Sequence, residues 1–155
     1  YTNYSSIKSK ELESNAKCSA LFHWDKFGLQ VRIRGTAIRC TDSKNDAYFS
    51  SRDLGSQVAA WASDQSKEIE SLEMMDVSYQ KIMDKFNIGN LEDNSEKKIP
   101  RPNFWGGYEI WVEEIELWKN QKNRFHDRLK FTRNINIKNG NIEADKRWNV
   151  IRIQP

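Results

Sequence analysis

Hydrophobic and polar positions alternate most clearly over residues 29–39 (LQVRIRGTAIR). From position 30 to position 37, small or aliphatic side chains occupy the odd positions and polar side chains the even ones. This period of two is typical of a β-strand with one buried face. Residues 17–24 (KCSALFHW) are typical of a second strand, and Asp25 to Gly28 provide a turn between the two. The pattern therefore predicts a β-hairpin over residues 17–39.

Four segments have the composition or the end signals of helices. Residues 42–52 follow Thr41, a good N-cap residue, and residues 67–87 place apolar side chains near helical spacing. A polar loop over 88–98 and two prolines after it separate these helices from the rest of the chain. The predicted helices are residues 6–15, 42–52, 56–63 and 67–87.

The pattern returns to strands after Gly106-Gly107. Within residues 134–146, Asn139-Gly140 is a strong hairpin signal. Strands do not alternate regularly with helices, which disfavours a parallel α/β fold. The sequence therefore predicts antiparallel strands with helices inserted between them. The predicted C-terminal strands are residues 107–112, 114–118, 123–133 and 147–153.

Composition narrows the class of protein. A chain of 155 residues is the size of one domain, and an aromatic content of 12% argues against disorder. We expect no membrane association, because no apolar run approaches the roughly 18–20 residues of a membrane-spanning helix. A net charge of +3 gives no reason to expect nucleic acid as a partner. Cys18 and Cys40 make no disulfide framework and belong to no metal-ligand cluster, so we expect free thiols in the cytoplasm.

The segment Arg124-Phe125-His126-Asp127-Arg128 is the first candidate for chemistry. On a strand, Arg124, His126 and Arg128 would point to one face. Two guanidiniums and an imidazole on one face suit a phosphate or a carboxylate, because arginine offers a planar fork of donors. The alternative is a solvated basic face on an edge strand.

Two further sets are candidates. The first set is Tyr48, Arg52 and Ser56, which on a continuous helix would form a stripe suited to phosphate. Gly55 can break that helix, and polar stripes on helices are often only solvated. Gln65-Ser66 follows an apolar helix, where helix capping by Ser63 or Ser66 is the plainer interpretation.

The tryptophans after residue 100 belong to the core, to an interface or beside a planar cofactor. Glycine-rich phosphate-loop motifs are absent from the sequence, which gives no support to the common nucleotide-binding folds.

Taken together, several ordered motifs resemble the pyridoxamine/pyridoxine 5′-phosphate oxidase family. Their spacing is similar over nearly the whole chain, and residues 134–146 are the main unmatched stretch. The matching motifs are Tyr1-Thr2-Asn3-Tyr4, Ser6, Lys8, Gln30-Val31-Arg32, Tyr48-Phe49-Ser50-Ser51-Arg52, Ser56-Gln57, Ala60-Trp61, Gln65-Ser66, Pro100-Arg101-Pro102, Trp105-Gly106-Gly107-Tyr108, Ile115-Glu116-Leu117-Trp118, Arg124-Phe125-His126-Asp127-Arg128 and residues 148–155.

The resemblance implies an FMN-binding split β-barrel, mainly antiparallel β with inserted helices, that works as a homodimer with FMN at the subunit interface. It implies oxidation of pyridoxamine or pyridoxine 5′-phosphate to pyridoxal 5′-phosphate, with O2 as the acceptor. The FMN contacts would be Tyr1, Thr2, Lys8, Gln30, Gln65, Ser66, Trp118 and Arg128. The substrate contacts would be Tyr48, Arg52 and Ser56 at the phosphate, with the catalytic pair Arg124 and His126 beside the pyridine ring.

The chain also departs from the family pattern. Ile7 stands where the family has a basic residue, which implies the loss of one FMN phosphate contact. Asp53 stands where proline is common, and Trp111 is unusual at its position. The family's N-terminal strands have no counterpart before Tyr1, so we expect residues 1–155 to be a single split-barrel domain that lacks those strands. Two alternatives stay open: a related split-barrel flavoenzyme acting on another small ring, as in phenazine pathways, and a non-catalytic flavin- or haem-binding or inactive truncated relative.

Overall fold

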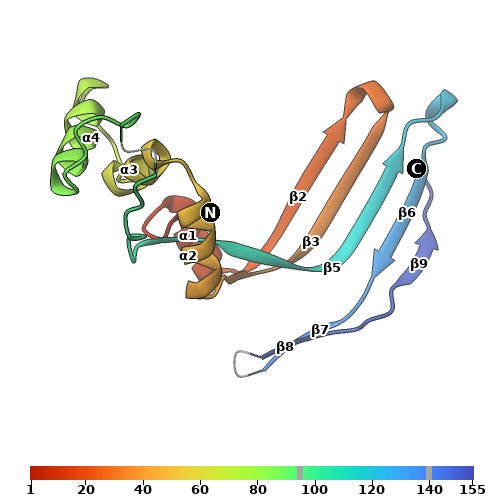
Figure 1. The fold of residues 1–155 in the computed structure, drawn as a ribbon. Coiled ribbons are helices and arrows are strands. Elements are labelled where there is room, and N and C mark those ends of the chain that lie inside the picture. The colour runs from red at the N-terminus through yellow and green to blue at the C-terminus, as the bar shows by residue number, and fades with distance from the viewer. Residues whose placement is uncertain (94–95, 139–140) are drawn as a thin grey trace. The chain divides into compact units, whose positions relative to one another are not determined.

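The computed structural model describes residues 1–93, 96–138 and 141–155 (Figure 1). Contacts group the chain into two units. Unit 1 holds Tyr1–Ser14 and Arg39–Glu109, and unit 2 holds Asn15–Ile38 and Ile110–Pro155. The α-helices of the described residues belong to unit 1, whereas most of the strands belong to unit 2. The predicted fold class, mainly antiparallel sheet with inserted helices, is confirmed.

The predicted hairpin forms as β2 (Lys17–Trp24) and β3 (Leu29–Arg39), with the predicted bounds. The strands pair antiparallel in a register that runs from Lys17↔Thr36 to Trp24↔Leu29. A short 3-10 turn connects them and ends at Gly28, whose φ of 56° lies in the left-handed region that glycine adopts without strain. Local sequence therefore specified this hairpin completely.

The two strands lie in a five-stranded sheet of order β2-β3-β5-β6-β9. Strand β5 (Tyr108–Lys119) is one continuous element where the sequence predicted two strands. The antiparallel partner of β5 is β6 (Asp127–Thr132), which in turn pairs with β9 (Asn149–Arg152). Strand β6 begins four residues later than predicted, because a 3-10 turn at Lys122–Arg124 occupies the chain before it.

The hairpin predicted within residues 134–146 is present as β7 (Ile135–Lys138) and β8 (Asn141–Ala144). The two strands pair antiparallel, with Ile137 opposite Ile142. The Asn139-Gly140 turn on which the prediction rested lies outside the described residues.

Unit 1 packs its helices around an apolar core. The helices are α1 (Ile7–Ser14), α2 (Asp42–Ser51), α3 (Leu54–Ala62) and α4 (Glu73–Lys85). A two-residue bridge of β1 (Thr2–Asn3) with β4 (Trp105–Gly106) joins the start of the chain to the segment after the prolines. The buried core residues are Phe49, Leu54, Val58, Met83, Ile88, Ile99 and Trp105.

Two helix predictions are wrong at their starts, because α3 begins two residues earlier than predicted and α4 six residues later. Helix α2 ends at Ser51 and α3 begins at Leu54, so Tyr48, Arg52 and Ser56 do not lie on one continuous helix. The interruption is at Arg52-Asp53 rather than at Gly55, since Asp53 acts as the N-cap of α3. Helix α4 begins at Glu73 instead of residue 67.

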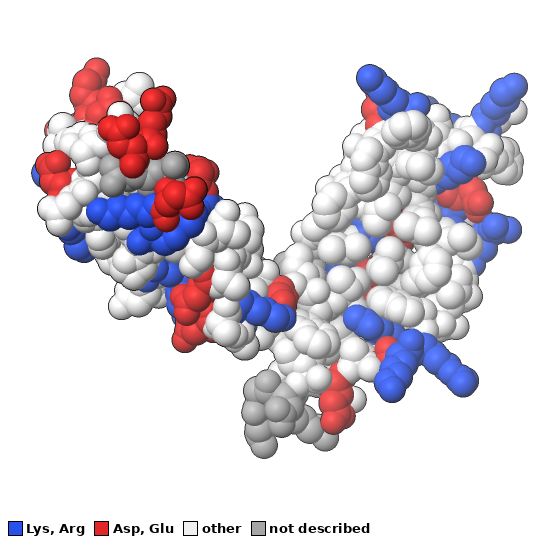
Figure 2. All heavy atoms as spheres, in the orientation of Figure 1, with Lys and Arg blue, Asp and Glu red and all other residues white. Residues whose placement is uncertain are grey.

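The two units carry opposite charge. Unit 2 has 14 Lys and Arg against 7 Asp and Glu, for a net +7, and unit 1 has 11 against 15, for a net −4. Figure 2 shows acidic side chains gathered over the part of unit 1 that holds α4, and mostly basic side chains projecting from unit 2. The small net charge of the whole chain therefore hides a strongly basic unit.

Candidate functional site

Unit 1 contains a cavity of about 400 Å³ between the chain start, the end of α2, helix α3 and β4. Five residues predicted from the sequence line it: Tyr1, Thr2, Tyr48, Arg52 and Gln65. Its other lining residues are Asn3, Ala59, Ala60, Ser63 and Trp105. The tertiary structure therefore gathers predicted residues that are up to 64 positions apart in the sequence.

Arg52 provides the charge of this cavity. Its Nη1 atom is buried and has no hydrogen-bond partner among the described residues. The guanidinium carbon lies 5.1 Å from the centroid of the Trp105 ring, a cation–π distance. A buried cationic donor without an acceptor is costly, and an anionic oxygen would relieve that cost. This arrangement marks the cavity as a site for an anionic group.

Aromatic rings form one side of the cavity. Tyr1 stacks on Tyr48 with 3.8 Å between ring centroids and 12° between planes, and Trp105 lies 5.2 Å from Tyr1. Burial, and next the Cys40 thiol, raise the pKa of the Tyr1 phenol, so Tyr1 stays neutral and can donate a hydrogen bond at physiological pH. Flat rings beside a cationic fork suit a ligand that is both aromatic and anionic.

Gln65 is held against β1. Its Oε1 atom accepts hydrogen bonds from Thr2 Oγ1 and from the Asn3 backbone N–H, both at 2.8 Å. Asn3 Nδ2 also donates to the Ser63 carbonyl at 3.3 Å. The side chain thus fastens the residues after α3 to the start of the chain. Ser63, one of the two expected capping residues, is the C-cap of α3. The next residue, Ser66, has a left-handed φ of 72°.

Three predicted residues of unit 1, Lys8, Ser56 and Ser66, are not among the described residues that line the cavity. Lys8 is exposed on α1. Ser56 lies in the first turn of α3, where its backbone N–H donates to Asp53 Oδ1 at 2.7 Å. Hydrogen bonds from the Ser56 side chain and backbone hold the pKa of Asp53 below its ordinary value. Asp53, which stands where proline is common in the family, therefore acts as the N-cap of α3.

In unit 2 the structure brings Gln30 and Trp118 together. Both line a mostly apolar cavity of about 290 Å³ at the end of the sheet where β2, β3, β5 and β6 contribute residues. Trp118 also lies beside His126, with 4.6 Å between ring centroids. Two predicted residues, Gln30 and His126, therefore lie near the indole ring of a third, Trp118.

Arg128, on β6 directly opposite Trp118, is held by an acidic partner. Its Nε and Nη2 atoms donate to Glu116 Oε1 at 2.9 and 2.7 Å, and its Nη1 donates to the Gln154 carbonyl at 2.9 Å. Glu116 is only 4% exposed and also accepts from Arg32. This Arg–Glu–Arg cluster could not be predicted from the sequence, since its members come from three different strands.

The expectation that Arg124, His126 and Arg128 share one strand face is wrong. Only Arg128 lies on β6, because the strand begins at Asp127. Arg124 ends the preceding 3-10 turn with a left-handed φ of 62°, and His126 Nδ1 accepts from the Gln121 N–H at 3.3 Å. Among the described residues other than asparagine and glycine, only Ser66 and Arg124 have a positive φ. Backbone strain of this kind is often found at functional sites.

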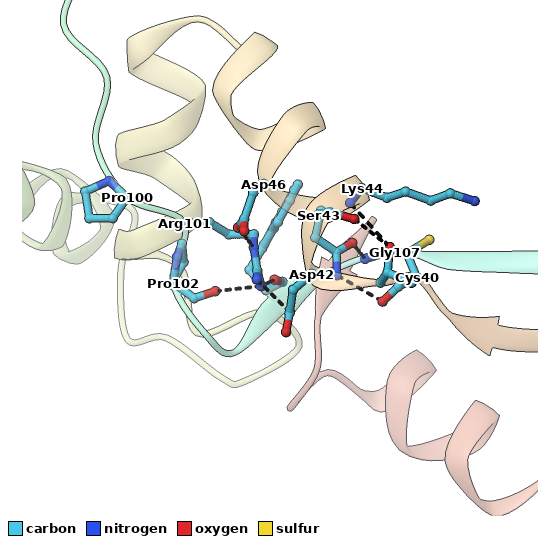
Figure 3. Close-up of polar contacts among 12 residues, drawn as sticks. Cys40, Asp42, Ser43, Lys44, Asp46, Pro100, Arg101, Pro102 and Gly107 are labelled. Atoms are coloured by element: carbon cyan, nitrogen blue, oxygen red, sulfur yellow. Dashed lines mark hydrogen bonds and ion pairs between the residues drawn. The ribbon is translucent and has the colours of Figure 1, made fainter. Parts of the chain in front are cut away.

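Sequence reasoning also missed Arg101, which ties the segment before β4 to α2 (Figure 3). Its Nε donates to Asp46 Oδ1 at 2.6 Å, its Nη2 to Asp42 Oδ1 at 2.8 Å and its Nη1 to the Trp105 carbonyl at 2.7 Å. Burial acts to lower the pKa of Arg101, but the hydrogen bonds to the two carboxylates outweigh it and the pKa is raised. The only indication of this residue in the sequence was its place between two prolines in the Pro100-Arg101-Pro102 motif.

Asn45 supplies a second tie beside Arg101. The side chain is buried, its Oδ1 accepts from the Gly107 N–H at 2.8 Å, and its Nδ2 donates to Tyr4 Oη at 3.2 Å. A Cβ atom at Gly106 would lie 2.0 Å from Tyr4 Oη, so only glycine fits there. The described residues hold no group of three His, Cys, Asp or Glu that could bind a metal ion, and no helix among them could cross a membrane.

Comparison with known proteins identifies the family. Residues 1–86 match the family described as pyridoxamine 5′-phosphate oxidase, and residues 105–155 match the pyridoxine 5′-phosphate oxidase C-terminal dimerisation region. The pyridoxine/pyridoxamine 5′-phosphate oxidase of Rubrobacter xylanophilus is 40% identical over all of this chain and 63% of its own length. That of Brucella anthropi is 39% identical over all of this chain and 68% of its own length. The chain thus spans about two thirds of the length of these curated relatives.

Solved structures agree on the fold. PhzG from Burkholderia lata, in complex with tetrahydrophenazine-1-carboxylic acid, has a TM-score of 0.79 at 25% identity, covering 99% of this chain and 66% of PhzG. A pyridoxamine 5′-phosphate oxidase-related, FMN-binding protein from Nostoc punctiforme has a TM-score of 0.59 at 11% identity, which shows the fold alone. The fold is that of the FMN-binding split-barrel proteins. Within that class, the chain belongs to the pyridoxamine 5′-phosphate oxidase family.

The residues present are suited to FMN, which family membership supports as the cofactor. Unit 2 offers the flat indole of Trp118 and the amide of Gln30, which line one cavity. A planar ring system that carries hydrogen-bonding groups, such as the flavin of FMN, suits groups of these two kinds.

Proposed function

We propose that the protein oxidises pyridoxine 5′-phosphate or pyridoxamine 5′-phosphate to pyridoxal 5′-phosphate, with FMN as cofactor and O2 as acceptor. The alcohol would lose two hydrogens as O2 becomes hydrogen peroxide, and the amine would in addition take up water and release ammonia. The observation that carries this proposal is the buried Nη1 of Arg52, set among aromatic rings in a chain of this family.

The substrate phosphate would bind at the end of α2. Arg52 would donate to it as a planar fork, and the phenol of Tyr48, which lies at the same cavity, would add an O–H donor. Ser56, one turn further on, would donate its hydroxyl by exchanging the Asp53 contact for the phosphate. A dianionic phosphate would provide the hydrogen-bond acceptor that the buried Nη1 atom of Arg52 lacks.

The cofactor contacts that we propose are those implied by the family pattern. When bound, FMN supplies the two-electron chemistry that amino-acid side chains lack. This chain would hold it through hydrogen-bonding groups and one indole. Three of these residues, Gln30, Trp118 and Arg128, belong to unit 2, whose net charge of +7 favours an anionic cofactor. The proposed residues are Tyr1, Thr2, Lys8, Gln30, Gln65, Ser66, Trp118 and Arg128.

Arg124 and His126 are proposed to hold the pyridine ring of the substrate. His126 lies against Trp118, and Arg124 is presented from a strained turn beside it. The turn fixes the backbone position from which the Arg124 side chain would reach the substrate. Neither residue is assigned as an obligatory base.

A homodimer is proposed as the working form. The C-terminal match is to a dimerisation region, and unit 2 exposes large apolar side chains such as Phe22 and Trp24, with about half of each surface accessible. Exposed apolar surface of this extent is typical of interaction sites. Cys18 and Cys40 are both free, which fits the cytoplasmic setting that we propose.

The test is a visible spectrum of the purified chain with FMN under anaerobic conditions, before and after addition of pyridoxine 5′-phosphate. We expect a protein-bound band near about 450 nm that bleaches with substrate and returns with air. Pyridoxine without its phosphate is the matched control and should bleach the band far more slowly. Bound flavin that pyridoxine 5′-phosphate leaves unchanged would contradict the proposed activity.

A second candidate is a split-barrel flavoenzyme acting on another aromatic acid. The similarity to PhzG, whose crystal structure holds a tricyclic carboxylic acid, favours it. A carboxylate can also accept from the guanidinium fork of Arg52. Bleaching by a dihydro-aromatic carboxylic acid, together with no response to pyridoxine 5′-phosphate, would favour this candidate.

A further inference from the structure

We propose that Arg101 is a positioning residue that aims Arg52 at the substrate phosphate without touching any ligand. This inference rests on the proposed function, because it assigns a determinant of phosphate affinity at the same site. Arg101 is not among the described residues that line the cavity, and its side chain is only 9% exposed. Its effect on the site must therefore pass through the residues that it binds.

Arg101 joins two parts of the chain that build opposite sides of the cavity. Its Nε and Nη2 atoms donate to Asp46 and Asp42, one turn apart on α2. Its Nη1 atom donates to the carbonyl of Trp105, on β4. Figure 3 shows Arg101 between the two carboxylates, with the neighbouring segment that leads to Gly107. One guanidinium thus fixes the distance between α2 and the backbone of Trp105.

The connection from Trp105 to Arg52 is direct. Arg52 is the C-cap of α2, and its guanidinium carbon lies 5.1 Å from the Trp105 ring centroid. The ring therefore limits where the guanidinium can point, and the helix fixes where its backbone starts. Displacement of Trp105 relative to α2 would turn the Arg52 fork away from its present direction. The planar three-way geometry of Arg101 prevents that displacement, and lysine, with a single point charge, cannot reproduce it.

A purely structural role is the competing explanation, since a buried cation between two carboxylates also stabilises the fold. The two explanations differ in what they predict for ligands. Misdirection of Arg52 weakens binding of the phosphate ester and leaves the unphosphorylated alcohol unaffected. General loosening of the fold affects both alcohols alike and does not depend on Arg52.

The experiment is a double-mutant cycle on the FMN-loaded chain with Arg101→Lys, Arg52→Gln and the double variant. Arg101→Lys keeps the positive charge, so the fold is retained. We expect it to raise KM for pyridoxine 5′-phosphate by about tenfold, with kcat within about twofold and KM for pyridoxine unchanged. In the Arg52→Gln background the same substitution should have no further effect on KM, because the two residues act through one contact.

The matched control is Arg39→Lys, in unit 1, whose ion pair with Glu13 is half exposed. It should leave both KM values unchanged. Amide hydrogen exchange over residues 102–107 gives a readout without ligand, and it should accelerate in Arg101→Lys but not in Arg39→Lys. Equal effects on the two alcohols, or effects that multiply in the double variant, would overturn the positioning role.

Failure of the proposed function would look different. In that case the wild-type chain would not oxidise pyridoxine 5′-phosphate at all, and titration with inorganic phosphate would decide the role of Arg101. Weaker phosphate binding in Arg101→Lys, with no further loss in the Arg52→Gln background, would support a positioning role at the cavity. Unchanged phosphate affinity would overturn it.

Discussion

The guanidinium of Arg52 lies over the ring of Trp105, 53 positions further along the chain, at 5.1 Å from the ring centroid. A cation–π contact of this kind is worth about 1–2 kcal/mol when it is shielded from water, which offsets part of the cost of burying a charged group. It leaves the in-plane donors of the guanidinium available to an anion. The contact with Trp105 therefore holds the guanidinium beside the cavity and offsets part of its desolvation cost.

Replacing Arg52 with glutamine should separate binding from stability. A charge-assisted hydrogen bond contributes about 1.5–3 kcal/mol, so Arg52→Gln should weaken binding of pyridoxine 5′-phosphate by about 10–100-fold. The free energy of unfolding should not fall, because a buried charge is removed as well. Substrate titration and urea unfolding measure the two effects. Lys17→Gln, at an exposed ion pair, is the control and should leave ligand affinity unchanged. Equal affinity in Arg52→Gln and wild type would contradict the assignment.

Asp53 should make unfolding depend on pH. Its pKa in the folded state lies below its ordinary value because Ser56 donates to it. A lowered carboxyl pKa stabilises the fold at every pH above the unfolded value of about 3.9, and the stabilisation is lost as the pH falls through the folded pKa.

The check is urea unfolding of wild type and Asp53→Asn from neutral pH down to pH 3. Wild type should be the more stable at neutral pH, and the difference should shrink below about pH 4 as Asp53 is protonated. Asp64→Asn, at an exposed ion pair with Lys67, is the control and should show a smaller change. A difference that stays constant over this range would exclude the charge of Asp53 as its source.

Glycine and alanine at position 124 should differ in stability but not in activity. Arg124 has a φ of 62°, which alanine adopts only with strain and glycine adopts freely. We expect Arg124→Gly to be more stable than Arg124→Ala by about 1 kcal/mol, whereas both lose the guanidinium and most of the oxidase activity. Thermal unfolding and steady-state kinetics would show this. Equal stability of the two variants would mean that the turn relaxes.

Glu116 should be the most sensitive position of unit 2. It is 4% exposed and accepts from both Arg32 and Arg128. Glu116→Gln leaves two guanidiniums facing one neutral amide, and we expect a loss of about 2–3 kcal/mol, less than for a fully buried pair because both arginines are partly exposed. Chemical unfolding gives the value. Glu113→Gln, at an exposed pair with Lys17, should cost less than about 0.5 kcal/mol.

Several elements were predictable because local interactions decide them. The β2–β3 hairpin has the predicted bounds, since a period of two and a glycine turn are encoded within 23 residues. Helix α2 begins after Thr41, whose hydroxyl accepts from the Lys44 N–H as an N-cap does. These signals need no knowledge of the rest of the fold.

The errors fall where packing overrides local pattern. The helical composition of residues 67–72 does not produce a helix, because Ser66 takes a left-handed conformation and Lys67 closes a turn onto Asp64. Strand β6 starts late for a similar reason, since Asn123 and Arg124 are both left-handed. Conformations of this kind are costly in isolation and persist only when surrounding contacts support them.

The candidate site was also predictable in part, where local sequence decides it, and not where tertiary contacts decide it. The sequence by itself determined the strands of the hairpin, the start of α2 and, through ordered motifs, the family and the residues proposed for the site. Tertiary structure alone decided that Trp105 lies under Arg52, that Arg101 ties α2 to β4, and that Glu116 is buried between two arginines. Periodicity and capping depend on neighbours in the chain, whereas burial and pairing of a charge depend on residues that only folding brings together.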